Sequence, residues 1–263
     1  MLIDFHTHAF PEKIAGKAIE KLSFVSGGLE PYTDGTLDGL KKSMKDGEVD
    51  ISVVMNIATN ATQQKNVNDF AASINNGKDI FAFGSVFPDS EDALCELERI
   101  KDLGLVGVKL HPDYQGFFVD DEKMKPIYKK ISQLGLVTLF HAGFDYGFAP
   151  PYGATPERME KALAWFDGPV IAAHWGGLNQ CEGVLKHLCG KDIYFDTSFG
   201  YGSIPKYYAE KIIEMHGSEK MLFGTDTPWH TPKMEMRLLN NLSLSDEEMQ
   251  NITHKTAQKL LKI

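Results

Sequence analysis

Two histidines, His6 and His8, stand two residues apart at the end of a short apolar segment that is typical of a β-strand. Residues i and i+2 of a strand point to the same side, so both imidazoles can reach one point. Two converging imidazoles are suited to bind one divalent metal ion. Because a single His-x-His sequence is a weak signal, the interpretation depends on what the other strand ends carry.

Other candidate ligands close apolar runs further along the chain. His111, His141, His174 and Asp226 each stand at the end of a predicted strand. In a closed barrel the strand ends converge on one small rim. Several titratable groups at an apolar rim would be costly unless a cation or a proton network satisfied them. The set therefore indicates a shared site rather than separate, hydrogen-bonded core histidines.

The elements that must position these residues repeat one pattern of a short apolar strand and a longer amphipathic helix. The strands are too apolar to alternate between core and solvent, which is typical of a parallel sheet covered by helices. Helices are predicted over 37–46 and 121–134, and the last helix begins with a capping box at Ser245–Glu248. The predicted strands are residues 2–6, 51–58, 80–87, 105–111, 136–141, 170–174, 193–198 and 221–226.

Eight strands that are each followed by a helix predict an α/β fold, the (β/α)8 TIM barrel, with residues 1–263 forming a single domain. Active sites of such barrels lie in the loops at the carboxyl ends of the strands. The loop 142–155 is long and rich in Gly, Pro and aromatic residues. Whether the aromatic residues near these loops line a pocket or only pack stays open. The candidate substrate contacts are Phe144, Tyr146, Arg158, Trp175 and His230.

The composition limits the partners. There are 36 acidic and 27 basic residues, hence a net charge of −9, which argues against general affinity for nucleic acid or an anionic membrane. The three cysteines form no Cys-x-x-Cys motif, the N-terminus lacks the pattern of a signal peptide, and no apolar stretch approaches a membrane span. We expect a cytoplasmic protein that acts on a small molecule. No sequence feature specifies a homo-oligomer, and that state stays open.

The sequence resembles the amidohydrolase superfamily, in particular its amidohydrolase-related branch, also called amidohydrolase 2. Motifs that carry the resemblance occur in the family's order and span nearly the whole chain. They are Asp4-Phe-His6-Thr-His8, Gly107-Val-Lys109-Leu-His111-Pro112, Phe140-His141-Ala-Gly143, Ala173-His174-Trp-Gly176 and Phe223-Gly-Thr-Asp226-Thr-Pro228.

The resemblance implies a ligand set and a proton donor. By this analogy, His6, His8, His141 and Asp226 hold one divalent metal ion, most often zinc. His174 lies nearby and acts as a proton donor or stabilises a developing oxyanion.

Lys109 is the residue for which the resemblance leaves two roles open. In two-metal relatives a carboxylated lysine on the fourth strand bridges the ions, and Lys109 is the only residue here that could do so. In that case Lys109, His111 and His174 would belong to a second metal site. An uncarboxylated Lys109 ammonium would instead bind a substrate carboxylate. We favour one metal ion.

The resemblance implies an enzyme, and the leading hypothesis is a metal-dependent hydrolase. It would cleave a C–N or C–O bond of a small amide, lactone or ester, because zinc lowers the pKa of bound water to about 7 and Asp226 can accept the proton. The alternative is a metal-dependent nonoxidative decarboxylase of an aromatic or unsaturated carboxylic acid. A third hypothesis is a metal-bound binding module without turnover, against which the intact His174 and Asp226 argue.

Overall fold

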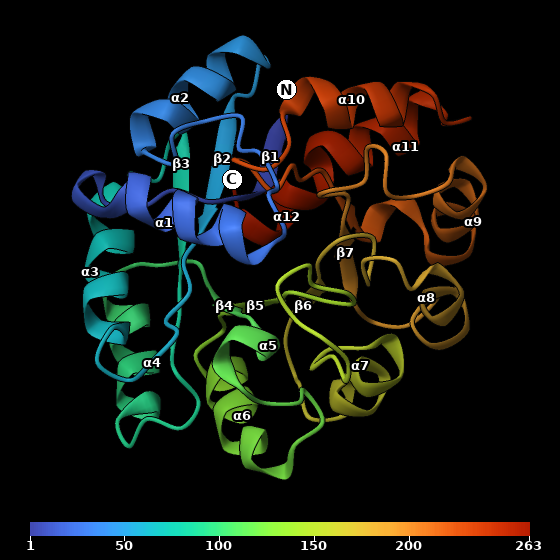
Figure 1. Ribbon diagram of the computed structural model, residues 1–263. Coiled ribbons are helices and arrows are strands. Elements are labelled where there is room, and N and C mark those ends of the chain that lie inside the picture. Colours follow the sequence, from blue (N-terminus) through green and yellow to red (C-terminus); the bar gives the residue numbers. More distant parts are fainter.

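Eight parallel strands pair in chain order and form a single sheet that curls into a barrel (Figure 1). The computed structural model describes all residues, 1–263. In-register pairs such as Lys109 with Leu139 set the alignment of neighbouring strands. The TIM barrel predicted from the sequence is confirmed. Its strands are β1 (Ile3–Thr7), β2 (Ile51–Met55), β3 (Ile80–Gly84), β4 (Gly107–Leu110), β5 (Val137–Phe140), β6 (Val170–Ala172), β7 (Tyr194–Asp196) and β8 (Met221–Leu222).

Helices surround the barrel, and α1 crosses one of its open ends (Figure 1). The predicted helix 37–46 is confirmed as α2, and 121–134 is a 3-10 turn followed by α6. None of the helices has the length and apolarity that crossing a lipid bilayer requires. They are α1 (Glu12–Val25), α2 (Leu37–Asp46), α3 (Gln64–Ile74), α4 (Ala93–Asp102), α5 (Pro112–Gln115), η1 (Glu122–Met124), α6 (Lys125–Gln133), α7 (Pro156–Leu163), α8 (Cys181–His187), α9 (Lys206–His216), η2 (Ser218–Lys220), α10 (Pro232–Asn240), α11 (Asp246–Gln250), η3 (Asn251–Lys255) and α12 (Thr256–Leu261).

The barrel closes through backbone hydrogen bonds between β1 and the segment that follows β8. The Phe5 amide donates to the Phe223 carbonyl at 2.8 Å, and the Asp226 amide donates to the His6 carbonyl, also at 2.8 Å. A single bridge joins Thr7 to Thr227. This closure brings the last predicted ligand, Asp226, beside the first two, although 218 positions separate it from His8.

Five predicted strands extend too far at their carboxyl ends by two residues or more. The strands predicted to end at residues 58, 87, 174, 198 and 226 end at residues 55, 84, 172, 196 and 222. His174 and Asp226 both have positive φ, at 59° and 64°, a conformation that cannot continue a ladder. The apolar runs therefore continue into loops, and these two site residues lie beyond the strands on which they were predicted.

The apolar core has two parts, one inside the barrel and one between the barrel and its helices. The inner cluster of 15 buried residues comes from the strands and from α12, which contributes Ala257, Leu260 and Leu261. The outer cluster of 44 buried residues joins the opposite faces of the strands to the helices. The C-terminal helix thus plugs the end of the barrel opposite the loops that follow the strands.

The predicted capping box at the start of α11 is confirmed, since Ser245 accepts from the Glu248 amide and the Glu248 side chain accepts from the Ser245 amide. We expect Ser245→Ala to lower the free energy of unfolding by about 1 kcal/mol, because an orphan amide loses its acceptor. Ser245→Thr, which keeps a hydroxyl at the cap, should stay close to the wild type. Urea unfolding measures both, and equal midpoints for all three proteins would contradict the role of the cap.

Candidate metal centre and cavity

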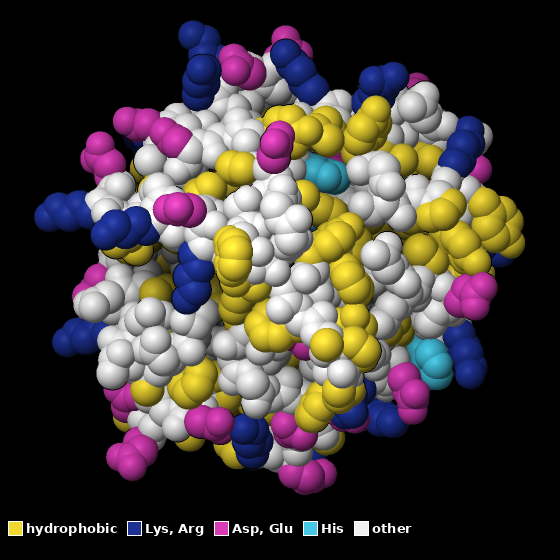
Figure 2. Space-filling model, viewed as in Figure 1, with side chains coloured by type: hydrophobic (Ala, Val, Ile, Leu, Met, Phe, Trp, Pro, Cys, Tyr) yellow, Lys and Arg dark blue, Asp and Glu magenta, His cyan; other side chains and the backbone are white.

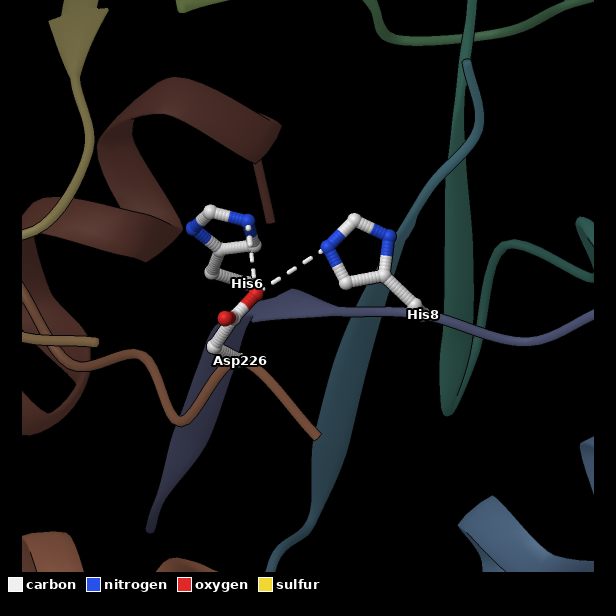
Figure 3. A group of neighbouring side chains, drawn as sticks. All are labelled: His6, His8 and Asp226. Atoms are coloured by element: carbon white, nitrogen blue, oxygen red, sulfur yellow. Dashed lines mark hydrogen bonds and ion pairs between the residues drawn. The ribbon is translucent and has the colours of Figure 1, made fainter. Parts of the chain in front are cut away.

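Three side chains converge where β1 meets the segment after β8 (Figure 3). The Nε2 atoms of His6 and His8 lie 3.4 Å and 3.1 Å from Oδ1 of Asp226. In a tetrahedral zinc site with metal–ligand bonds of 2.0–2.1 Å, neighbouring ligand atoms stand roughly 3.3 Å apart. The two imidazole planes are inclined at 61°, so their lone pairs can converge. The donor set and spacing fit a divalent metal ion.

Both imidazoles are held in the orientation that a metal ligand needs. Nδ1 of His6 donates to Oδ2 of Asp196 at 2.8 Å, and Nδ1 of His8 donates to the carbonyl of Met55 at 2.9 Å. With its proton fixed on Nδ1, His6 presents an unprotonated Nε2 toward Asp226, and His8 points its Nε2 at the same carboxylate oxygen. Burial lowers the pKa of His6 to about 3, so its imidazole is neutral near pH 7.

A β-bulge in β1 turns His6 toward the inside of the barrel. Asp4 pairs with Ser52 and Thr7 with Val54, so β1 carries one more residue than β2 over this stretch. Phe5 already belongs to the apolar cluster inside the barrel. The extra residue lets the next side chain, His6, face the same interior, as bulges near active sites often do.

His141 lies in a neighbouring cluster rather than with His6, His8 and Asp226. Its ring stacks on that of His111, with centroids 4.1 Å apart and planes inclined by only 10°. Asp145 Oδ2 lies 3.2 Å from His111 Nε2 and 3.7 Å from His141 Nε2. Lone pairs of parallel imidazoles cannot converge on one ion at about 2 Å. As they stand, His111 pairs with Asp145, and His141 stacks on His111. The assignment of His141 as a fourth metal ligand stays a prediction that requires its ring to turn.

His174 joins the two clusters. Its Nε2 lies 3.0 Å from Nδ1 of His141, and its Nδ1 lies 2.9 Å from the hydroxyl of Ser198. The backbone amide of His174 donates to Oδ1 of Asp196 at 3.0 Å. Burial lowers the pKa of His174, so the imidazole is neutral near pH 7. A neutral imidazole held at both nitrogens can pass a proton along its hydrogen bonds.

Lys109 points into the metal centre from β4. It is 1% exposed, and its Nζ donates to Nε2 of His6 at 3.2 Å. Burial lowers the pKa of Lys109 to about 8, although Asp196 and Asp226 act in the opposite direction. The ammonium is therefore mostly charged at pH 7. A metal ion that takes the Nε2 lone pair of His6 would release this ammonium for another acceptor.

These groups line one end of a cavity of about 700 Å³. Half of the lining residues are apolar, and α1 contributes Ile14 and Leu22 to the wall. On the face shown in Figure 2, hydrophobic side chains gather across the centre, whereas the charged side chains lie mostly around the periphery. The cavity thus joins a polar metal centre to a largely apolar compartment.

The predicted substrate contacts are only partly brought to this cavity. Tyr146 lines it, whereas Phe144 packs edge-on against Tyr146 and does not. Arg158 forms an ion pair with Asp120 and stacks over Phe118, away from the cavity.

The remaining two candidates are buried and do not line the cavity. The Trp175 indole donates to the Thr197 carbonyl at 2.9 Å. His230 pairs with Glu235 and stacks on Phe199 with centroids 4.2 Å apart, and of these only Phe199 lines the cavity. His230 therefore supports the wall through Phe199, and neither Trp175 nor His230 lines the cavity.

Sequence reasoning missed Asp145, Asp196 and Ser198. The run that ends in Asp196-Thr-Ser198 closes a predicted strand with polar residues, so its position was a usable signal. Asp145 stands inside the loop 142–155, where no periodic pattern indicates direction. Its role depends on how that loop folds back over the barrel.

Comparison with known proteins assigns a family and a fold. A sequence model described as Amidohydrolase matches residues 3–263. Among curated proteins, none matches the chain. An uncharacterised TIM-barrel protein from Bordetella bronchiseptica is similar in structure, with a TM-score of 0.78, 18% identity, and coverage of 99% of this chain and 98% of the other.

Two decarboxylases are also similar in structure. A 2,6-dihydroxybenzoate decarboxylase complexed with 2,6-dihydroxybenzoate has a TM-score of 0.75 at 16% identity, covering 100% of this chain and 99% of the other. A dihydroxybenzoic acid decarboxylase from a Polaromonas species, with bound manganese and the inhibitor 2-nitroresorcinol, has a TM-score of 0.73 at 16% identity, covering 99% and 96%. At these identities the likeness shows the fold.

The Asp196–His6 bond generates a prediction for metal affinity. We expect Asp196→Asn to weaken metal binding by about 10- to 100-fold, because the carboxylate that fixes the His6 proton on Nδ1 is lost. Asp192→Asn, whose carboxylate is 98% exposed, is the matched control and should bind as the wild type does. Competition with a chromophoric chelator measures the dissociation constants. Equal affinity in both variants would show that Asp196 does not orient the ligand.

Proposed function

This chain belongs to the amidohydrolase family, because the family match spans residues 3–263. We propose that it is a metal-dependent decarboxylase of a small aromatic or unsaturated carboxylic acid. The observation that carries the proposal is a buried cation, Lys109, beside the candidate metal ligands at the end of a half-apolar cavity. A carboxylic acid with a planar apolar ring or chain fits this site, because its carboxylate can pair with Lys109 and its apolar part can contact the apolar lining.

Charge favours an anionic substrate over a neutral one. Lys109 is buried within contact distance of His6 and is mostly protonated at pH 7. A cation in a site of low dielectric needs an anionic partner, and a divalent ion would balance the two nearby carboxylates, Asp196 and Asp226. A substrate carboxylate provides it, whereas a neutral amide or lactone does not.

The reaction would break the bond between the carboxyl carbon and the carbon that bears it. The electron pair stays on that second carbon, carbon dioxide leaves, and a proton replaces it. A divalent ion held by His6, His8 and Asp226 would supply positive charge to the carboxylate and a neighbouring oxygen substituent. His174 borders the cavity and is hydrogen bonded at both nitrogens, which supports the proposal that it delivers the proton.

The decarboxylases among the structural neighbours add support from outside the chain. One of them contains manganese, so manganese and zinc are both candidates for the ion. The ligand set of two imidazoles and a carboxylate accommodates either.

Hydrolysis of an amide, lactone or ester is the second candidate, and Asp226 is the observation that favours it. Burial raises the pKa of this carboxyl, but the hydrogen bond from His8 and the nearby histidines outweigh burial, so the pKa is lowered. An ionised Asp226 carboxylate at the metal centre can accept a proton from water.

A substrate panel separates the two candidates. Protein loaded with manganese or zinc is incubated with aromatic acids, including 2,6-dihydroxybenzoate, and with cyclic amides, lactones and esters. We expect carbon dioxide release from an acid, lost on metal removal and reduced about 10²- to 10⁴-fold in His174→Asn, because the proton donor is gone. Ring opening or ester cleavage without carbon dioxide would overturn the proposal in favour of hydrolysis.

Lys109→Met tests the role of the buried ammonium. If Lys109 binds the substrate carboxylate, the variant keeps its metal ion and loses about 10- to 100-fold in kcat/KM for acids, since one charge-assisted hydrogen bond is removed. If Lys109 instead carries a bridging carbamate, the variant loses metal. Elemental analysis beside steady-state kinetics decides between the roles, and the loss of metal would contradict ours.

A further inference from the structure

Asn56 is a buried amide at the edge of the candidate metal centre that none of the roles above uses. It directly follows β2, is 6% exposed and lines the cavity. The preceding residue, Met55, provides the carbonyl that orients His8. Asn56 is therefore fixed close to one of the candidate metal ligands.

The hydrogen bonds of Asn56 determine which end of its amide faces the cavity. Nδ2 donates to the carbonyls of Phe83 at 3.0 Å and Val54 at 3.4 Å. Only a donor satisfies two carbonyl oxygens, so the nitrogen must occupy this side and Oδ1 the other. Oδ1 forms no hydrogen bond in the structure, and part of its surface stays accessible.

The other buried amides show that this free oxygen is an exception. Oδ1 of Asn68 accepts from the Ser85 amide, Oε1 of Gln64 from the Phe87 amide, and Oε1 of Gln115 from the His111 amide. Each buried amide oxygen outside the cavity thus has a backbone donor. A side chain held at its nitrogen, with its oxygen left open in the cavity, is prepared to accept a hydrogen bond from a ligand.

We infer that Oδ1 of Asn56 selects acids that carry a second group with a hydrogen to donate, a phenolic hydroxyl or a ring N–H. The inference rests on the proposed acid substrate and narrows its class. Nδ2 is held by two carbonyls, so the amide cannot turn over to offer a donor. An ether or carbonyl oxygen at this place would face Oδ1 with lone pairs against lone pairs. Sites built around a buried acceptor discriminate strongly against ligands that lack the donor.

Binding of a matched ligand pair tests the inference without requiring turnover. The probes are 2,6-dihydroxybenzoate and 2,6-dimethoxybenzoate, titrated calorimetrically into metal-loaded wild type, Asn56→Leu and Asn56→Ala. We expect the wild type to prefer the hydroxylated acid and both variants to lose at least about 10-fold of that preference, as removal of a buried acceptor implies. In Asn56→Ala the smaller side chain leaves room for water to hydrogen bond to the two carbonyls. This variant therefore keeps the test valid if Asn56→Leu fails to fold.

The control removes a second amide from the same cavity. Asn66 also lines the cavity but is exposed, and the structure gives its side chain no hydrogen bond, so Asn66→Leu should keep the wild-type preference. The inference would be overturned if folded Asn56→Ala kept the preference for the hydroxylated acid, or if Asn66→Leu lost as much of it. It would also be overturned if the wild type bound neither acid, or bound both equally. If Asn56 controls the preference while no acid releases carbon dioxide, the decarboxylase proposal fails and the acceptor role stands. If an acid releases carbon dioxide and the preference does not depend on Asn56, the decarboxylase proposal stands and the acceptor role fails.

Discussion

The hydrogen bond from Nδ1 of His6 to Asp196 is the interaction on which the rest of the site depends. It leaves Nε2 of His6 as a lone pair directed at the centre of the barrel mouth. Asp226 approaches that lone pair from one side and the ammonium of Lys109 from another. The same carboxylate, Asp196, also accepts from the backbone amide of His174, so the metal ligand and the candidate proton donor share one anchor.

Charge balance explains why a cation and an acid can both be accommodated. The carboxylates of Asp196 and Asp226 are ionised because hydrogen bonds from the neighbouring histidines outweigh the burial that opposes ionisation. The imidazoles of His6 and His174 are neutral through burial, which leaves Lys109 as the buried cation beside them. A divalent ion adds positive charge to this set. An anionic substrate then compensates for the excess, and the apolar remainder of the cavity suits the body of such a molecule.

Two of the reactive groups, His174 and Asp226, lie on loops, and their strained backbone conformation sets the direction of their side chains. His174, Phe199 and Asp226 all have positive φ, which costs of order 1–3 kcal/mol for each residue other than glycine. Backbone hydrogen bonds hold two of them in place, from the Asp226 amide to the His6 carbonyl and from the His174 amide to Asp196. These turns aim side chains across the barrel mouth in directions that a regular strand would not allow.

The sequence determined the barrel, the order of its strands and the convergence of His6, His8 and Asp226, because apolar runs and strand-end histidines are local signals in a repeating fold. It did not determine that His141 lies with His111 and Asp145, that Arg158 is occupied by Asp120, or that Asn56 keeps a free oxygen. Those outcomes depend on loop paths and on partners distant in the chain. A side chain's type limits the bonds it can form, but only the packed structure decides which partner comes within reach.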